Sequence, residues 1–154
     1  YMMNGAITLG TMDGANVEIV ERVGFENAEI FGLRVEDVDH FKQENSYNVW
    51  QYYDTHYEIK RVVDTLTDGT FSADPQDFRI IYNELMFKND EFFVLADFNA
   101  YREAQERVER RYQDKQGWAR MCLVNIAKSG FFSSDRTIQQ YADEIWHINP
   151  IDVK

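Results

Sequence analysis

The sequence contains very little cysteine, only two prolines and no long apolar run. Cys122 is the single cysteine among 154 residues, so a disulfide within the chain is excluded and a reducing, cytoplasmic setting is expected. No apolar segment approaches the roughly 20 residues that a membrane helix needs. Tyr1 is not followed by a basic region and an apolar stretch, so no signal peptide is expected.

Basic residues are also in short supply. The chain has 16 lysines and arginines against 27 aspartates and glutamates, which gives a formal charge of −11. Such a chain repels phosphate backbones and anionic lipids, so neither nucleic acid nor a membrane is expected as a partner. Hydrophobic residues nonetheless make up 44% and aromatic residues 15%. This composition predicts a folded protein with a packed core, because disordered segments are poor in such residues.

The first part of the chain alternates between strand and helix patterns. Residues 6–10 form a short β-branched run bounded by glycines, and residues 11–14 then turn the chain. Apolar residues at helical spacing lead to Gly24, which suits a helix C-cap, and residues 28–32 are expected to form a second strand. Strand, helix and strand within about 30 residues make one βαβ unit, so the two strands are predicted to be parallel.

A parallel sheet of two strands is not stable by itself, because it needs more strands and helices on both faces. The missing strands are expected upstream of this sequence. The abrupt start at Tyr1, without a polar lead-in, is interpreted as a cut through a larger domain.

From residue 34 onward the pattern is helical. Asp74 and Pro75 are the expected N-cap and first-turn pair of the third helix, and Ser134 is the expected cap of the last. The type of the apolar run at 92–95 stays open. Apolar residues at helical spacing predict helices within 35–41, 50–69, 78–86, 101–112, 118–126 and 138–146.

The glycines near the N-terminus do not form a nucleotide-binding motif. Gly5, Gly10 and Gly14 match neither G-x-G-x-x-G nor a P-loop. The helix that starts near Asp13 offers either an anion site at its N-terminus or simply a tight turn. The turn is favoured, because Asp13 would itself occupy the anion position.

Residues that could carry other chemistry are scattered. His40, His56 and His147 lie far apart and lack a second ligand at metal-like spacing, so no metal site is expected. Cys122 lies on the apolar stripe of a helix, where a small buried core residue is favoured over a nucleophile. Carboxylates are too abundant for any two to be chosen as a glycosidase pair.

Two charged segments have simple structural interpretations. Residues 103–111 alternate in sign, which is typical of a solvated helix face with i,i+4 pairs. Residues 133–136 allow a phosphorylation site, although a helix cap followed by an acid in the first turn explains them more simply. Taken alone, the residues predict a soluble α/β fragment without a self-contained active site.

Three stretches, in the same order and spacing, resemble the α-glucan phosphorylases that act on glycogen, starch or maltodextrin. Residues 40–90 match that family loosely. The matching stretches are residues 1–18, which contain D-G-A-N-V-E; residues 27–38, which contain N-x-x-I-F-G and V-E-D-V; and residues 125–146, which contain F-S-S-D-R-T-I.

The first stretch resembles the tail of the family's cofactor signature. That signature reads E-A-S-G-T-G-N-M-K, then two residues, then Leu or Met, then Asn. Tyr1 and Met2 would be the two spacers, followed by Met3 and Asn4. The signature's lysine, which carries pyridoxal phosphate in the family, would stand immediately before Tyr1. The resemblance thus implies that Tyr1, Met2, Met3 and Asn4 are the cofactor-associated residues, and that the chain contains no catalytic residue.

The resemblance also implies a fold and an activity. The fold would be α/β, part of the C-terminal Rossmann-like lobe of a GT-B glycosyltransferase, with a βαβ portion at 1–33 and a helical section at 34–154. The activity would be reversible phosphorolysis of α-1,4-glucan ends to glucose 1-phosphate, with pyridoxal phosphate as cofactor. The implied partners are the glucan, orthophosphate, an N-terminal lobe and the second subunit of a homodimer.

The lysine and the N-terminal lobe lie outside these residues, so this chain alone is expected neither to bind pyridoxal phosphate covalently nor to turn over glucan. The alternative function is a non-catalytic structural or interaction domain derived from the same lobe. A nucleotide-sugar transferase is a weaker third hypothesis, because the lysine-signature tail would have no role there. The terminal helix, with Ile145 and Trp146, is expected to pack on the rest of the enzyme and to cause oligomerisation when isolated.

Overall fold

The computed structural model describes residues 1–149 and 151, which are mostly helical with one short two-stranded sheet. The last element, η4, is π-helical. In chain order the elements are η1 (Met2–Asn4), β1 (Leu9–Gly10), α1 (Ala15–Val23), η2 (Phe25–Asn27), β2 (Glu29–Ile30), α2 (Val35–Glu44), α3 (Val49–Thr55), α4 (Tyr57–Asp64), α5 (Arg79–Met86), α6 (Val94–Gln113), α7 (Lys115–Lys128), η3 (Ser129–Phe132), α8 (Ser134–Gln140) and η4 (Tyr141–Trp146).

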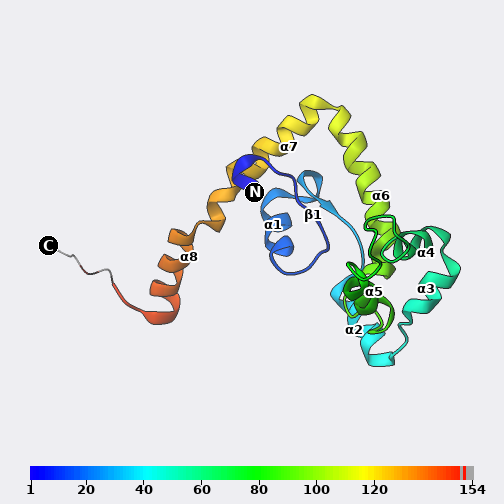
Figure 1. Ribbon diagram of the computed structural model, residues 1–154. Coiled ribbons are helices and arrows are strands. Elements are labelled where there is room, and N and C mark those ends of the chain that lie inside the picture. Colours follow the sequence, from blue (N-terminus) through cyan, green and yellow to red (C-terminus); the bar gives the residue numbers. More distant parts are fainter. Residues whose placement is uncertain (150, 152–154) are drawn as a thin grey trace.

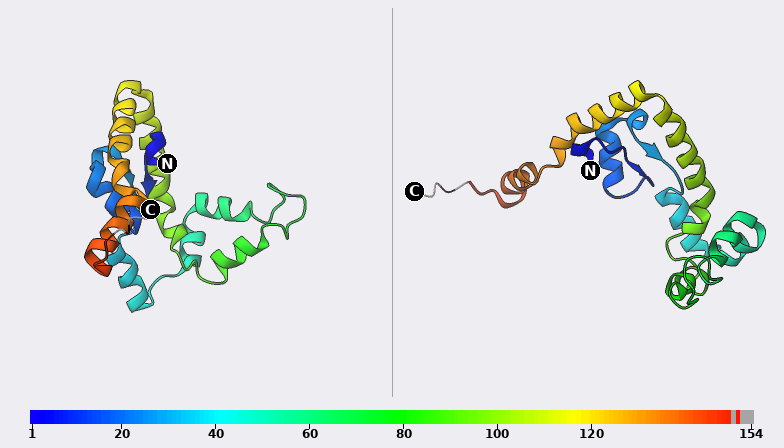
Figure 2. Two further views of the ribbon diagram at one scale, coloured as in Figure 1. Left: turned by 90° about the vertical axis from the view of Figure 1, so that its left-hand side faces the viewer. Right: turned by 45° about the horizontal axis from the view of Figure 1, so that its top comes forward.

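Two long helices form the frame of the molecule. α6 and α7 meet at Asp114 and diverge from it like the two sides of an inverted V (Figure 1). The β1–α1–β2 unit lies beneath α7, and the N-terminus lies beside that helix. The helices α2–α5 gather around the other end of α6, and α8 and η4 extend away from both groups (Figure 2).

The sheet has the predicted parallel arrangement. Leu9 lies opposite Glu29 and Gly10 opposite Ile30, with α1 as the crossover. α1 ends at Val23 with Gly24 as its C-cap, as predicted, and the φ of 82° at Gly24 favours glycine. The strands are shorter than the predicted runs 6–10 and 28–32, because each has a partner on only one side within the described residues.

The buried apolar side chains form two clusters. One joins Val20, Val23 and Ala28 of the βαβ unit, and Met2 and Val124 pack against it. The other lies among the helices α3–α6 and consists of Tyr47, Val49, Ile59, Val63, Met86, Phe93 and Leu95.

The prediction of one helix over 50–69 was wrong. The segment forms α3 and α4, separated at His56, whose backbone is extended at φ −118° and ψ 100°. The break lets Val49 of α3 and Ile59 and Val63 of α4 enter the same core. Apolar residues recur at helical spacing on both sides of the break, so periodicity alone does not reveal it.

The predicted start of the third helix was also wrong. α5 begins at Arg79, with Phe78 as its N-cap. The Asp74 Oδ1 atom accepts a hydrogen bond from the Gln76 backbone N–H at 2.9 Å. Asp74 and Pro75 therefore belong to a separate turn, because an aspartate side chain can close a turn as readily as it caps a helix.

The last helix differs from its prediction at both ends. Ser133, one residue before the predicted Ser134, is the N-cap, and its Oγ accepts from the Arg136 N–H at 3.3 Å. Regular α-helix ends at Gln140, and the π-helical segment that starts at Tyr141 carries the chain on. The run 92–95, left open by the sequence, leads into α6, which begins at Val94.

Candidate functional site

An open groove of about 750 Å³ lies beside the first residues of the chain. Three of the four predicted site residues, Tyr1, Met2 and Met3, line it, whereas Asn4 is not part of its wall. Its other walls come from the segment before β1, from α1 and from η3. The lining residues beyond the first three are Ala6, Ile7, Thr8, Leu9, Asn16, Ile19, Ser129, Gly130, Phe132 and Ser133.

The start of the chain is held as a tight backbone turn. The Tyr1 carbonyl accepts hydrogen bonds from the Asn4 N–H at 2.9 Å and from the Ala6 N–H at 3.3 Å. The Gly5 N–H donates to the Met2 carbonyl at 2.8 Å, and Gly5 ends η1 with a φ of 76°. The Tyr1 side chain is fully exposed, so the backbone fixes its position.

Helix α7 packs closely against this turn. A Cβ added to Gly5 would lie 3.2 Å from the Cys122 Cβ and 3.5 Å from the Ile126 Cδ1. Cys122 is half-buried rather than fully buried, because this contact covers one side of it only. The prediction of a buried core residue was therefore wrong, and Cys122 is a partly exposed residue that packs against the turn.

The groove does not hold pyridoxal phosphate with its own residues. This cofactor needs an amine for its Schiff base and cationic or N–H groups for its phosphate. No lysine, arginine or histidine lies among the residues that line the groove. Its polar side chains are hydroxyls and the Asn16 amide, so these residues fit the support of a neighbouring segment and not the capture of an anionic cofactor.

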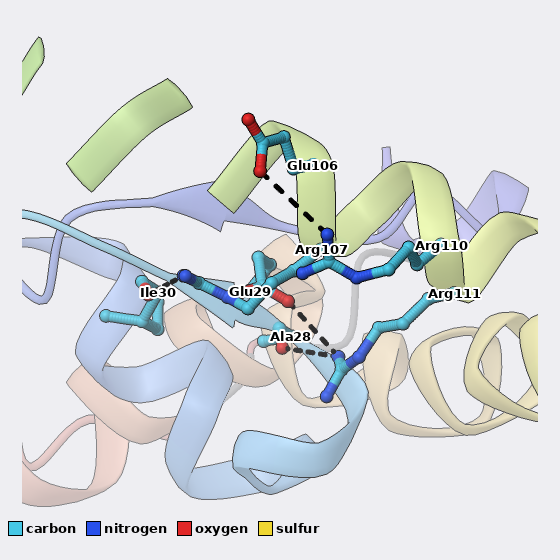
Figure 3. A network of polar contacts seen from close by, with 7 residues as sticks. All are labelled: Ala28, Glu29, Ile30, Glu106, Arg107, Arg110 and Arg111. Atoms are coloured by element: carbon cyan, nitrogen blue, oxygen red, sulfur yellow. Dashed lines mark hydrogen bonds and ion pairs between the residues drawn. The ribbon is translucent and has the colours of Figure 1, made fainter. Parts of the chain in front are cut away.

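A polar network that the sequence did not reveal lies between β2 and α6 (Figure 3). Glu29 is only 5% exposed, and one carboxylate oxygen accepts from Arg107 Nε at 2.5 Å. The other oxygen lies 3.5 Å from Arg111 Nη1. The same guanidinium groups donate to backbone carbonyls, Arg107 to Ile30 at 3.5 Å and Arg111 to Ala28 at 3.2 Å.

The prediction that residues 103–111 form only a solvated face was therefore wrong for Arg107 and Arg111. It was correct for Arg110, which lies 3.9 Å from Glu106 on the exposed side of α6. A signal was present in the sequence, because Glu29 falls inside the predicted strand 28–32 of a parallel sheet. Such strands are covered on both faces, and a buried carboxylate requires partners. The network fastens β2 to α6 and leaves no free carboxylate there for acid–base chemistry.

The remaining candidate residues have local roles. Thr11 Oγ1 donates to Asp13 Oδ1 at 3.1 Å, and Asn16 Nδ2 donates to the Thr11 carbonyl at 2.8 Å. The predicted turn at 11–14 is thus confirmed. Across the residues that the structure describes, no three His, Cys, Asp or Glu side chains are grouped to hold a metal ion. Over the same part of the chain, the helices are too short or too polar for a bilayer crossing.

Comparison with known proteins relates the sequence of this chain to one family. A family model described as carbohydrate phosphorylase matches residues 1–148. The glycogen phosphorylase of Bacillus subtilis is 45% identical over 151 residues, which cover 98% of this chain and 19% of that protein. The muscle form of glycogen phosphorylase from Bos taurus is 52% identical over 151 residues, covering 97% of this chain and 18% of that protein.

The brain form of glycogen phosphorylase from Mus musculus is 47% identical over 155 residues, covering all of this chain and 18% of that protein. The chain therefore spans less than a fifth of the length of these curated relatives. The family match includes Tyr1 to Asn4, the sheet and the long helices alike. Because the match extends over nearly every residue, the chain belongs to the carbohydrate phosphorylase family.

Proposed function

We propose that this chain is the carboxyl-terminal part of a pyridoxal-phosphate-dependent α-1,4-glucan phosphorylase. The full protein would transfer glucosyl units from glucan ends to orthophosphate and release glucose 1-phosphate. The observation that carries the proposal is that proteins named glycogen phosphorylase align with 97–100% of this chain at 45–52% identity.

In this proposal the residues of this chain hold the backbone beside the groove and take no part in bond formation or proton transfer. Tyr1, Met2 and Met3 form one wall of the groove, and their backbone turn fixes the chain where it enters the fold. The cofactor, when bound in the full protein, would supply a phosphate group that exchanges a proton with the substrate phosphate. The groups that bind it and its lysine would come from segments outside these residues.

The proposal includes an architecture and a setting. The chain would be part of the C-terminal Rossmann-like lobe of a GT-B enzyme, with the βαβ portion at 1–33 and the helical section at 34–154. The short parallel sheet of β1 and β2 supports this placement, because such a sheet requires further strands. Glucan, orthophosphate, an N-terminal lobe and a second subunit would be its partners, in the cytoplasm.

The same proposal makes the isolated chain inactive. A stable Schiff base needs a primary amine held beside the bound cofactor, and no lysine side chain lines the groove. We expect that borohydride reduction with pyridoxal phosphate adds no cofactor mass to this chain, and that the chain produces no glucose 1-phosphate.

The test compares the full-length protein with this chain. Both are incubated with maltodextrin and orthophosphate, with and without pyridoxal phosphate, and glucose 1-phosphate is measured. Cofactor-dependent product from the full-length protein alone is the expected result. Absence of product over several glucan lengths would overturn the activity and favour a non-catalytic structural domain, while product from the isolated chain would overturn its assignment as an inactive part.

A further inference from the structure

We infer that Arg107 and Arg111 close the outer edge of β2, the edge that faces away from β1, so that no further strand joins the sheet on that side. The strand that they keep out is β2 of a second copy of this chain, which is always present in solution. Neither a cofactor nor the reaction enters, because every group involved belongs to the described part of this chain.

The backbone of β2 faces two ways. The Glu29 N–H donates to the Thr8 carbonyl at 2.8 Å, so Glu29 directs its backbone toward the β1 side. Alternate residues of a strand direct their backbone groups to opposite sides, and the carbonyls of Ala28 and Ile30 therefore point outward. An edge with outward-pointing backbone groups is a template on which another chain can add a strand.

Both outward carbonyls accept hydrogen bonds from side chains of α6 (Figure 3). Arg111 Nη1 donates to the Ala28 carbonyl at 3.2 Å, and Arg107 Nη2 donates to the Ile30 carbonyl at 3.5 Å. A neighbouring strand would place its own N–H donors at these same two carbonyls. The two guanidinium groups thus lie where the next strand would have to lie.

A buried carboxylate holds the two arginines in this position. Glu29 is 5% exposed, and it accepts from Arg107 Nε at 2.5 Å while its second oxygen lies 3.5 Å from Arg111 Nη1. Each guanidinium therefore binds Glu29 and an outward carbonyl at once, which its planar, rigid set of donors allows. Moving an arginine away would leave the buried charge with fewer partners, which is unfavourable. The closed edge is therefore the stable arrangement.

The experiment opens the edge in the full-length protein without leaving an unpaired buried charge. Glu29→Gln removes the charge but keeps both arginines beside the outward carbonyls, so it serves as the reference. Adding Arg107→Ala and Arg111→Ala to this reference gives the edge variant, in which the carbonyls are uncovered. Adding Arg110→Ala and Arg120→Ala instead gives the matched control, because the charge changes equally and both of these side chains are exposed.

Two measurements follow the opened edge. Sedimentation velocity over a range of concentrations gives the strength of self-association, and amide hydrogen exchange of residues 28–31 reports pairing of the strand. We expect the edge variant to associate about tenfold more tightly than the Glu29→Gln reference, because at least two backbone hydrogen bonds form between the copies. Exchange at residues 28–31 should slow as the concentration rises. The control variant should behave like the reference in both measurements.

Three outcomes would overturn the closure of this edge. The first is an edge variant that associates no more tightly than the reference. The second is a control variant that associates as tightly as the edge variant, since net charge would then be responsible. The third is association with fast exchange throughout residues 6–31, because it would arise from unfolding and not from strand pairing.

A milder variant decides the question if the edge variant does not fold. Arg111→Ala, added to Glu29→Gln alone, uncovers the Ala28 carbonyl while Arg107 still connects β2 to α6. We expect its self-association to lie between that of the reference and that of the control-corrected edge variant, with slower exchange at residues 28–31 at high concentration. Association and exchange equal to those of the reference would overturn the inference.

Discussion

At the scale of single residues, the buried acid near the start of α6, Asp90, is satisfied by hydrogen-bond donors and not by cations. Asp90 is almost completely buried, and it accepts hydrogen bonds from the Tyr47 hydroxyl at 2.7 Å and from the Leu95 N–H at 2.8 Å. Burial, together with this bond to Asp90, raises the pKa of Tyr47 far above its usual range. Asp90 thus serves as the cap of α6 that Phe93, at a left-handed φ of 58°, does not provide.

Asp97 differs from Asp90 because its burial is poorly compensated. Its Oδ1 accepts one hydrogen bond, from the Leu33 N–H at 2.7 Å. Burial raises the pKa of Asp97 above its ordinary value of 3.8, and the nearby carboxylates of Asp90, Asp13 and Asp37 raise it further. A carboxyl group with a raised pKa in the folded state costs stability once it is ionised, so this cost is present at neutral pH. It disappears as the pH falls through the raised pKa toward 3.8.

We therefore predict that Asp97→Asn leaves the free energy of unfolding at neutral pH equal or higher, because the amide oxygen still accepts from Leu33. The advantage of the variant over wild type should shrink as the pH is lowered toward 4. Asp97→Ala, which removes the acceptor, should instead cost about 1–2 kcal/mol. Urea unfolding at several pH values gives the free energy of unfolding of all three proteins. An Asn variant that is less stable than the Ala variant would contradict this prediction.

At the scale of elements, the sequence predicted those features that depend on neighbours along the chain. Apolar spacing predicted α1, α6 and α7, and the βαβ order predicted the parallel pairing. The break at His56 was missed because it serves a core shared by α3 and α4. The pairing of Glu29 with Arg107 was missed because 78 positions separate them, and only the folded chain brings them together.

In the candidate site, too, local patterns could be predicted from the sequence and contacts between distant segments could not. The resemblance singled out Tyr1 to Asn4, since a motif is a local pattern, and three of these residues line the groove. Their association with the cofactor stays a prediction. The contact of Gly5 with α7 could not be predicted, because no periodicity within residues 1–10 indicates which helix lies beside them. The predicted division at residues 33 and 34 stays a prediction.

The network between β2 and α6 predicts an asymmetry among substitutions. Glu29 is 5% exposed, whereas the side chains of Arg107 and Arg111 are 40% and 38% exposed. Arg107→Ala leaves a buried carboxylate with one distant partner, and we expect it to cost about 2–4 kcal/mol. Glu29→Gln leaves guanidinium groups that water can reach, so it should cost only about 1 kcal/mol.

Arg110→Ala is the matched control on the same helix. Arg110 pairs with Glu106 at 3.9 Å with both side chains exposed, so its loss should change stability by less than about 0.5 kcal/mol. Urea denaturation, monitored by circular dichroism, gives the free energy of unfolding of each variant and therefore the order of the losses. If Arg110→Ala destabilised the chain as much as Arg107→Ala, the loss would reflect helix charge and not the network.

At the scale of the whole molecule, the chain exposes more surface than its mass requires. Its accessible surface is 10993 Å², whereas a compact monomer of 18.2 kDa exposes about 8,100 Å². The excess of about a third is on the scale of a large interface. The open V of α6 and α7 and the projecting α8 account for it (Figure 1). Such a shape suits a part of a larger protein, and the chain spans less than a fifth of the length of its relatives.

The last prediction concerns the projecting arm, which consists of α8 and η4. Ile138, Ile145 and Trp146 on α8 and η4 are 55%, 63% and 52% exposed, which is costly for large apolar side chains in water. We predict that the isolated chain self-associates through this face. Ile145→Gln combined with Trp146→Gln should then raise the dissociation constant at least about tenfold, because each buried side chain contributes roughly 2 kcal/mol.

A matched pair of substitutions tests whether self-association occurs through this face and not through nonspecific contacts of any exposed apolar side chain. Tyr57 and Phe92 are even more exposed, at 78% and 80%, but lie in the helical group around α6. Replacing both with glutamine removes similar apolar surface from the other end of the molecule. Sedimentation equilibrium over a range of concentrations should show weaker association for the arm variant only. If the Tyr57 and Phe92 variant dissociated instead, the helical group would be the surface that the rest of the protein covers first.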